Sequence, residues 1–298
     1  MSQQIPTHFV QQYTSNVQLL LQQRGSKLRN AVMSQTQTGK QAVAVDQWGA
    51  VSAAKRIGRY QPLLPQDTPS DRRWVFPNDY DWSDLIDNFD KLRMITDPQS
   101  SYVTNGTYAM GRAIDDEIIS GLLGDNKTGE SGATSTGILS AYNGGSQLVG
   151  TNVGGANSNL NLDKLRNAKK ILMQNEVDVD NDPLFIAMTA SQHDALLAET
   201  QVVSLDYNTK PVLVDGRITS FMGFNFITLE RLPKAASVRS CIAWAKSGAH
   251  LGMWGDIKPD VRQRADLSSL PWQVYVEGTF GATRTEEKKV VQINCTEA

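Results

Sequence analysis

The chain has 298 residues, with 29 lysines and arginines against 31 aspartates and glutamates, and 40% of its residues are hydrophobic. A chain of this length can bury a large core as one large domain or two ordinary ones, and its composition excludes collagen, coiled-coil rods and wholly disordered chains. Its net charge of −2 excludes a freestanding electrostatic nucleic-acid binder, which would carry a large basic excess.

Charge is unevenly distributed along the chain even though the total is nearly neutral. Residues 1–60 hold seven bases and the single acid Asp46, whereas residues 61–130 hold 13 acids and 6 bases. Such a split is compatible with internal pairing between two parts of one fold. It also suits self-association, because a positive arm of one copy can lie on a negative surface of another. The sequence leaves both interpretations open.

The N-terminal segment predicts a short helix or an extended arm. Apolar residues fall loosely at helical spacing between Thr7 and Val32, and Arg24-Gly25 interrupts the pattern. The segment has too little apolar content to form a core by itself, so we expect it to lie on another surface.

Residues 40–82 change to the periodicity of β-structure. Apolar positions over 42–51 indicate one strand, and Trp74-Val75-Phe76 begins another after a proline-rich link. The pattern predicts a long two-stranded excursion with a loose tip. Because isolated two-stranded ribbons are marginal in water, this excursion must rest on its own body or on a neighbouring subunit.

The strongest helical pattern runs from about Ser100 to Leu123. Its apolar residues recur every three or four positions, which predicts one long amphipathic helix packed on a sheet. Residues 124–159 then hold nine glycines and only three charged residues. That composition predicts a long flexible loop or a loosely structured hairpin.

An α/β segment and a run of strands complete the chain. We expect a helix from Leu162 to about Glu176, a buried strand over 184–188, and a helix ending near Glu199. Thr189 and Gln192 predict a capping box at the start of that last helix. Strand patterns dominate from Val212 onward, over 224–227, 241–244, 272–280 and 290–293.

No motif in the chain predicts a catalytic, metal or cofactor site. Residues 124–131 have the spacing of a P-loop, but Glu130 stands where a phosphate-binding lysine is needed. The aspartate-rich turn over 178–182 imitates a calcium loop, with Pro183 at the position that requires glycine. The three histidines lack metal-ligand spacing. We therefore expect no enzyme activity, no cofactor and no metal.

Two further patterns concern the compartment in which the chain works. Cys241 and Cys295 lie in apolar, strand-like surroundings, which favours buried thiols in a reducing compartment over a disulfide. No apolar run is long enough to span a membrane, and the N-terminus lacks the pattern of a secretory signal. These features predict a soluble protein of cytosolic type.

Four stretches of sequence resemble a family of phage capsid proteins. They are Phe9–Arg29 (FVQQYTSNVQLLLQQRGSKLR), Asp46–Arg56 (DQWGAVSAAKR), Asp79–Met94 (DYDWSDLIDNFDKLRM) and Gly111–Ile119 (GRAIDDEII). The order of predicted elements is also similar to that of the major capsid proteins of tailed bacteriophages with the Hong Kong 97-type fold. The resemblance covers nearly the whole chain, from Phe9 to about Ile293.

The resemblance implies an α+β, Hong Kong 97-like capsid fold. On this pattern, residues 1–39 form an N-terminal arm, and residues 40–94 hold the extended β-hairpin loop with its flanking strands. Residues 95–123 and 231–298 form the peripheral domain with its long spine helix. Residues 124–230 form the axial α/β domain with the Gly-rich loop.

The implied function is that of a major capsid protein, which self-assembles through pentamers and hexamers into an icosahedral shell around the phage DNA genome. The implied partners are other copies of the chain, a separate scaffolding protein, a portal protein, packaged double-stranded DNA held by weak sequence-independent contact, and a decoration protein. Kinship also implies expansion of a procapsid on maturation, and a location in the virion after assembly in the host cytoplasm. The candidate intersubunit contacts are Trp48, Lys55, Arg56, Arg59, Arg72, Arg73 and Trp74.

Other interpretations stay open on the sequence alone. An encapsulin-like nanocompartment shell shares the fold and would enclose an enzyme cargo. An α/β hydrolase would depend on a residue such as His193, and a monomeric DNA-binding protein would bind with steep salt dependence. Some members of the resembled family crosslink a loop lysine to a neighbouring asparagine. Lys55 lies in a suitable segment, but nothing around it specifies such a bond, and a surface cation is favoured.

Overall fold

The computed structural model describes residues 21–59, 65–87, 99–199, 213–214 and 217–297. The chain divides into two compact units. Among the described residues, unit 1 comprises 21–26, 79–87, 99–113 and 255–278, and unit 2 comprises 27–59, 65–78, 114–199, 213–214, 217–254 and 279–297. The chain passes between the units within helix α2 (Gln99–Leu123), strand β15 (Ala249–Gln263) and strand β16 (Trp272–Arg284).

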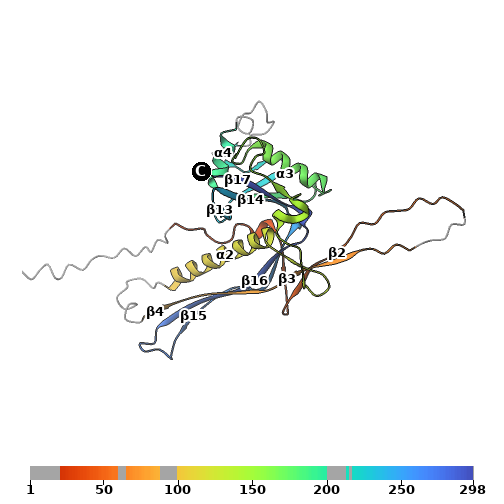
Figure 1. The fold of residues 1–298 in the computed structure, drawn as a ribbon. Helices are drawn as coiled ribbons and strands as arrows, with labels where there is room; N and C mark the ends of the chain where they lie inside the picture. Colours follow the sequence, from red (N-terminus) through yellow and green to blue (C-terminus); the bar gives the residue numbers. More distant parts are fainter. Residues whose placement is uncertain (1–20, 60–64, 88–98, 200–212, 215–216, 298) are drawn as a thin grey trace, which may run out of the picture. The chain divides into compact units, whose positions relative to one another are not determined.

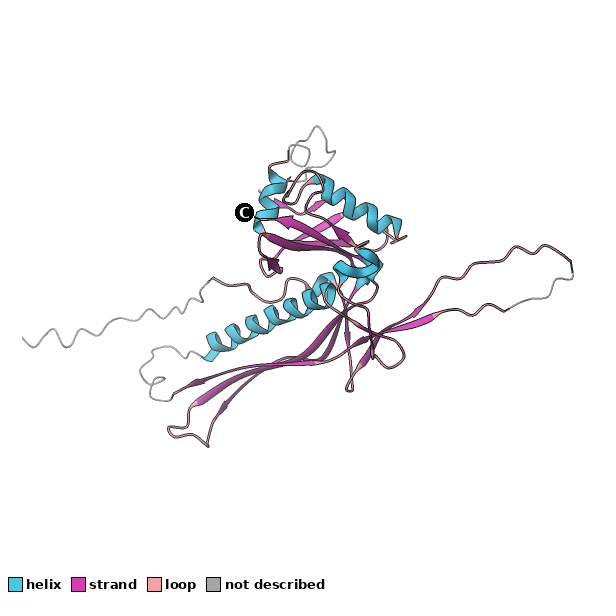
Figure 2. Ribbon diagram, in the orientation of Figure 1, coloured by secondary structure: helices cyan, strands magenta, loops and turns pink. Residues whose placement is uncertain are grey.

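The core of unit 2 is a seven-stranded mixed sheet (Figures 1 and 2). Its strands, in the order β11-β12-β8-β14-β17-β7 with β13 paired to β14, are β11 (Ser220–Phe221), β12 (Phe224–Thr228), β8 (Leu184–Met188), β14 (Val238–Ala245), β17 (Val290–Thr296), β7 (Leu148–Val149) and β13 (Lys234–Ala235). Strand β8 runs parallel to β12, and β14 is antiparallel to both β8 and β17. Residues 241–245 of β14 are fully buried, which explains their unbroken apolar pattern.

Two helices accompany this sheet. Helix α3 (Leu162–Gln174) contacts β17 and β7, and the Asn161 side chain caps it by accepting a hydrogen bond from the backbone N–H of Lys164. Helix α4 (Ala190–Leu197) begins with the capping box of Thr189 and Gln192 that the sequence predicts. Both helices and the predicted buried strand over 184–188 are therefore confirmed.

The long helix predicted from about Ser100 to Leu123 is α2, which runs from Gln99 to Leu123. Its fully buried apolar residues in unit 2 are Ile114, Ile118 and Leu122. They are separated by four positions each, so they lie on one face of the helix.

A second sheet has the strand order β1-β15-β16-β4, with β1 (Met33–Thr36) and β4 (Asn78–Ile86) at its edges. Strand β1 is parallel to β15, with Met33 opposite His250. The strand predicted over 272–280 is confirmed and continues to Arg284 as β16. Strand β9 (Leu213–Val214) pairs antiparallel with β10 (Arg217–Ile218). The described residues also form four short 3₁₀ turns: η2 (Arg29–Ala31), η3 (Leu139–Gly144), η4 (Lys246–Gly248) and η5 (Glu287–Lys289).

The predicted two-stranded excursion is confirmed, but its second strand begins at Ser70 and ends at Val75, whereas the pattern places its start at Trp74. Strand β2 (Ala42–Trp48) pairs antiparallel with β3 (Ser70–Val75), and the described residues between them, 49–59 and 65–69, form no helix or strand. Strand β3 also pairs with β5 (Lys127–Thr128), which pairs with β6 (Thr134–Ser135). Residues 124–159 thus contain this hairpin, η3 and β7, so the hairpin interpretation of the Gly-rich segment holds rather than that of a single loop.

The helical expectation over Thr7–Val32 is wrong for its described part. Residues 21–32 contain only the 3₁₀ turn η2, and residues 7–20 lie outside the described residues. Gly25 has a φ of +70°, which an α-helix does not accommodate. The backbone N–H groups of Lys27 and Leu28 donate to the Asp115 carboxylate and not to a helical carbonyl. The extended arm is the form that the described residues take.

Cys241 and Cys295 are both free and fully buried, as the sequence predicts. Within the described part of the chain, no helix combines the length and apolar character needed to cross a membrane. Across the same residues, no group of three or more His, Cys, Asp or Glu side chains is placed to hold a metal ion.

Candidate functional site

The most exposed part of unit 2 is the extended loop, which we define as β2, β3 and residues 49–69 between them. Every described residue over 48–59 and 65–72 is exposed. Three of them are large and apolar: Trp48, Val51 and Ile57 are 75%, 59% and 90% exposed. Exposed apolar side chains gathered on one segment are typical of surfaces that another molecule covers.

A buried ion pair holds the base of the extended loop. Arg73 Nη2 in β3 lies 2.6 Å from Glu287 Oε2 in η5, and the two side chains are only 7% and 4% exposed. Arg284 Nε lies 3.6 Å from the other oxygen, Glu287 Oε1. One carboxylate therefore faces two guanidinium groups. Burial lowers the pKa of Arg284, and the charge of Glu287 opposes that shift.

Arg284 also connects the Gly-rich segment to the end of helix α2. Its Nη1 donates to the carbonyl oxygens of Leu122 (2.6 Å) and Gly124 (3.1 Å). Its Nη2 donates to the carbonyl of Gly137 (3.1 Å) and to Thr136 Oγ1 (3.3 Å). A fully buried guanidinium with these acceptors fixes two chain segments, residues 122–124 and 136–137, beside the loop base.

Three further side chains of strand β3 make contacts near the loop base. Arg72 Nε lies 2.7 Å from Asp46 Oδ1 on the facing strand, and this pair is exposed. The Trp74 indole N–H donates to the carbonyl of Gly129 at 2.7 Å. Asp71 accepts from the Gly129 N–H at 3.0 Å and from the Thr128 hydroxyl. Burial alone would raise the pKa of Asp71, but these hydrogen bonds lower it.

The seven candidate intersubunit residues thus fall into two groups. Trp48, Lys55, Arg56 and Arg59 are exposed on the extended loop, and Arg72 is exposed but paired with Asp46. Arg73 and Trp74 make their polar contacts within the chain. Contact of any of the seven with a second copy stays a prediction. Sequence reasoning missed Glu287 and Arg284, because Glu287 lies 214 positions from Arg73 and no local pattern links them.

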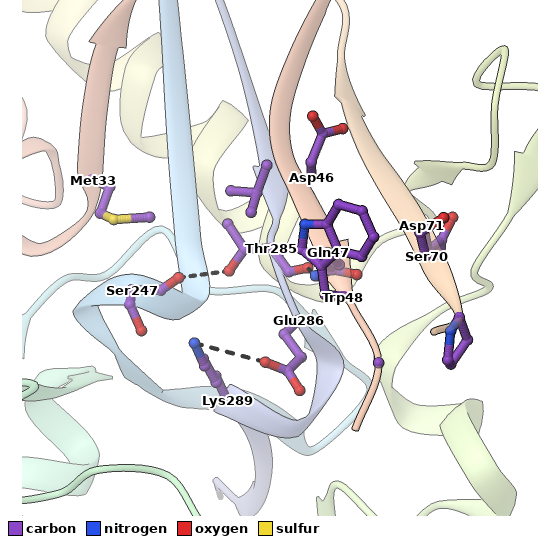
Figure 3. Close-up of a pocket in the computed structure, with 13 residues that line it drawn as sticks. Met33, Asp46, Gln47, Trp48, Ser70, Asp71, Ser247, Thr285, Glu286 and Lys289 are labelled. Atoms are coloured by element: carbon purple, nitrogen blue, oxygen red, sulfur yellow. Dashed lines mark hydrogen bonds and ion pairs between the residues drawn. The ribbon is translucent and has the colours of Figure 1, made fainter. Parts of the chain in front are cut away.

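A hollow of about 480 Å³ lies beside the loop base, within unit 2 (Figure 3). Trp48 and Gln47 line one side, and the turns that carry Ser247 and Glu286 line another. The Gln47 amide donates to the carbonyl of Thr285, and the Thr285 hydroxyl donates to the carbonyl of Ser247 at 2.6 Å. These bonds hold the walls of the hollow together.

Acidic residues of α2 hold distant segments of unit 2. The buried Asp115 accepts from the backbone N–H groups of Lys27 (3.0 and 3.1 Å) and Leu28 (3.0 Å). Asp116 forms an exposed ion pair with Arg231. Glu117 Oε1 accepts from the Asn78 amide at 2.8 Å.

The preceding residues of α2, within unit 1, form hydrogen bonds and close packing contacts with the N-terminal segment. Arg112 Nη1 donates to Gln22 Oε1 at 2.8 Å and to the carbonyl of Gln23 at 3.3 Å. A Cβ atom at Gly111 would lie 2.5 Å from the carbonyl carbon of Gly25. The stretch GRAIDDEII over 111–119 therefore anchors other segments of the chain through these contacts.

The C-terminal strand ends in a further cluster. Glu297 Oε2 lies 2.9 Å from Arg239 Nη2 and 2.9 Å from Lys234 Nζ, and Glu297 Oε1 accepts from Gln192 (3.1 Å) and Thr189 (3.0 Å) of the capping box. Burial alone would raise the pKa of Glu297, but these donors together lower it to about 2. The cluster joins the end of β17 to the start of α4.

The motifs that imitate catalytic or ligand sites have structural partners. His193 Nε2 accepts from the backbone N–H of Ile218 at 3.2 Å, which occupies the ring nitrogen that a general base would need. Asp178 accepts from the N–H groups of Asp180 and Asn181, and Asp182 accepts from Ser247. The aspartate-rich segment is therefore an acidic turn.

Comparison with known proteins gives one family. A family model described as phage capsid protein matches residues 5–297. No curated protein matches the chain by sequence.

Solved structures with the same fold come from phage capsids. The capsid of cyanophage P-SCSP1u is similar at a TM-score of 0.75 and 12% identity, over 98% of this chain and 94% of that one. The cyanophage Pam1 capsid asymmetric unit is similar at 0.71 and 12%, over 98% and 97%. The mature capsid of bacteriophage PhiM1 is similar at 0.70 and 11%, over 97% and 92%. At such identities the likeness shows the fold, which is the α+β, Hong Kong 97-like capsid fold. Because the family model covers nearly the whole chain, this protein belongs to the phage capsid protein family, and it is a structural component of the virion shell.

Proposed function

We propose that this capsid protein is the major shell subunit of a phage head, and that copies of it associate through pentamers and hexamers. In this proposal the extended loop of each copy lies on a neighbouring copy and supplies contacts between subunits. Trp48, Lys55, Arg56 and Arg59 make those contacts, while Arg73 and Trp74 hold the loop base in place from within the chain.

The observation that carries this proposal is the exposure of the extended loop. Its described residues over 48–59 and 65–72 are all exposed, and they include Trp48 and Ile57. Burial of apolar surface contributes roughly 25 cal/mol per Å², so covering these side chains on another subunit is favourable. A closed shell covers such surfaces on every copy without leaving an exposed edge.

Further parts of the proposal concern regions and partners. Residues 124–230 act as the axial domain, and residues 95–123 and 231–298 as the peripheral domain. A separate scaffolding protein, a portal protein and a decoration protein are partners of the assembled shell, which is built in the host cytoplasm. Double-stranded DNA is held by weak contact, because a net charge of −2 gives no strongly cationic lining that would immobilise the genome.

The alternatives from the sequence have less support. The match to a phage capsid family does not favour an encapsulin-like shell with an enzyme cargo. A hydrolase that uses His193 is disfavoured because its Nε2 already accepts a backbone hydrogen bond. Shells purified from phage-infected cells should accordingly contain DNA and no single enriched enzyme.

Expression of the chain, alone and with its scaffolding protein, tests the proposal. Negative-stain electron microscopy should reveal regular hollow particles, and sedimentation velocity should show a single large species. A stable, folded monomer under both conditions, with the extended loop against its own body, would contradict the proposal.

A shortened variant provides the matched control. The backbone N–H of Gly49 donates to the carbonyl of Pro69 at 2.7 Å, so the loop already closes at these two residues. Replacing residues 50–68 by a two-residue Asn-Gly turn keeps β2 and β3 paired. We expect this variant to keep the far-ultraviolet circular dichroism of the unassembled parent chain and to form no particles. Normal particles from it would show that the loop is dispensable.

A further inference from the structure

The extended loop has hollows lined partly by acidic residues at its base and a tip that carries cationic side chains around an apolar one. Trp48 lines two hollows at the base, of about 480 and 470 Å³. The charged residues that line them are four acids and two bases, namely Asp46, Asp71, Glu130, Glu286, Arg72 and Lys289. Arg72 pairs with Asp46, and Lys289 lies 3.6 Å from Glu286, so the lining carries a net charge of −2 through Asp71 and Glu130. The loop base is therefore a weakly acidic depression, and the exposed Trp48 indole lines it (Figure 3).

The outgoing part of the tip, residues 50–59, has the opposite charge, and Asp67 is the one acid in the described returning part, residues 65–69. Residues 47–59 contain no acid, and Lys55, Arg56 and Arg59 are all exposed around Ile57, which is 90% exposed. Arg56 donates to the carbonyl of Gly58 at 2.9 Å and to the carbonyl of Arg59. These bonds brace a turn that presents an apolar side chain between cationic ones.

The chain's own tip does not fill its own depression. None of the described residues over 50–59 lines either hollow. Occupancy by the tip of a second copy satisfies both surfaces, because positive and negative patches on two molecules attract and set their register. Since tip and base are different patches, the contact is heterologous, and repetition of it around a rotation axis closes a ring.

We propose that the depression at the loop base receives the loop tip of a second copy, with Ile57 against Trp48 and the three tip cations facing the acidic lining. The proposal rests on the shell function above and names the partner surface for the loop. In this arrangement the extended loop supplies both surfaces of the contact, its tip and its base. Each copy in a ring therefore inserts its tip into one neighbour and receives the tip of the other.

Cysteine crosslinking between copies tests the pairing. Two single variants, Trp48→Cys and Ile57→Cys, are co-assembled and then treated with a short bis-maleimide. The native Cys241 and Cys295 are fully buried and stay unreactive in the folded chain. Denaturing gels should show a covalent dimer in the mixture and far less of it in either variant alone. The double variant should give a ladder that ends at five or six copies.

The outcomes separate this inference from the proposed function. Particles that form normally but yield no mixed dimer, or a double variant linked only within single chains, would overturn the tip-to-base contact and leave the shell function intact. Failure of the unaltered chain to form particles under any condition would instead remove the proposed function itself.

Charge reversal gives a second test that does not alter Trp48. Arg56→Glu with Arg59→Glu should abolish particles, and so should Glu130→Lys with Glu286→Lys. Combining all four should restore particles if the two patches face each other. Arg166→Glu, on the exposed face of α3, is the matched control and should assemble normally. Unimpaired assembly by both reversed pairs would contradict the proposal.

Discussion

Arg73 and Glu287 lie 214 positions apart in sequence, and their side chains meet at 2.6 Å in an ion pair that is almost fully excluded from solvent. The pair connects the first buried residue of the extended loop's returning strand to the turn before the last strand. It therefore fixes the base of the loop to the turn that precedes β17, while residues 48–59 stay exposed.

Breaking this pair should lower the free energy of unfolding by several kcal/mol. Glu287→Gln leaves Arg73 and Arg284 buried without a counter-charge, and removing one partner of a buried pair costs about 3–5 kcal/mol. Urea unfolding followed by tryptophan fluorescence measures the loss. Asp46→Asn is the control, since it breaks the exposed pair with Arg72 and should cost less than about 1 kcal/mol. Equal losses in the two variants would show that the buried pair does not hold the loop base.

Asp115 should control the protection of the segment before β1. Asp115→Ala removes the acceptor for the backbone N–H groups of Lys27 and Leu28, and leaving such groups unpaired costs about 1–3 kcal/mol. Hydrogen exchange at these two amides should accelerate about tenfold or more. Asp116→Ala, which loses only the exposed pair with Arg231, should leave both amides protected. Unchanged exchange in Asp115→Ala would argue against this anchor.

Glu297 should make unfolding stability depend on acid pH. Its pKa of about 2 in the folded chain lies below the ordinary value of 4.5. Because the folded-state pKa is depressed, the stabilisation is fully present above pH 4.5 and is lost as pH falls towards 2. The difference corresponds to about 3 kcal/mol. Unfolding free energies measured from pH 7 to pH 2 should therefore fall less steeply for Glu297→Gln than for the parent chain.

A second variant separates the Glu297 cluster from general acid effects. Arg239→Met removes one donor and should raise the pKa of Glu297, which moves the loss of stability to higher pH. Lys288→Met removes an exposed cation outside the cluster, so the pH at which the unfolding free energy falls in acid should not change. If the unfolding free energies of Arg239→Met and the parent chain fall at the same acid pH, Arg239 does not stabilise the charged form of Glu297.

Gly111 should tolerate no side chain. A Cβ there would lie 2.5–2.7 Å from backbone atoms of Gly25 and Ser26, which cannot move as a flexible side chain can. Overpacking of this kind costs about 1–3 kcal/mol, against a gain of about 1 kcal/mol in helix propensity, so Gly111→Ala should be destabilising or at best neutral. Thermal unfolding measures the difference. Gly58→Ala meets open space and should change stability by less than about 0.5 kcal/mol. A clear stabilisation by Gly111→Ala would show that the Gly25 segment does not pack on α2.

Much of the secondary structure follows from local patterns. The spacing of Ile114, Ile118 and Leu122 predicts α2, the pair Thr189 and Gln192 predicts the start of α4, and alternation over 272–280 predicts β16. These features depend on residues within one or two turns of each other, so they can be read without knowing the rest of the fold. For the N-terminal segment the sequence left a short helix and an extended arm open, and the described residues form the arm, because a contact with Asp115 replaces helical hydrogen bonding at residues 27 and 28.

By itself, the sequence determined where α2, α3, α4, β8 and β16 lie, the buried state of the two thiols, the family resemblance and the existence of a ribbon too thin to stabilise itself. Only the tertiary structure decided that Arg73 is an internal anchor, that Glu297 closes the start of α4, and that an acidic depression stands beside Trp48. The physical reason is that periodicity reports on neighbours along the chain. Ion pairs and hollows arise instead between residues that the fold brings together from more than a hundred positions away.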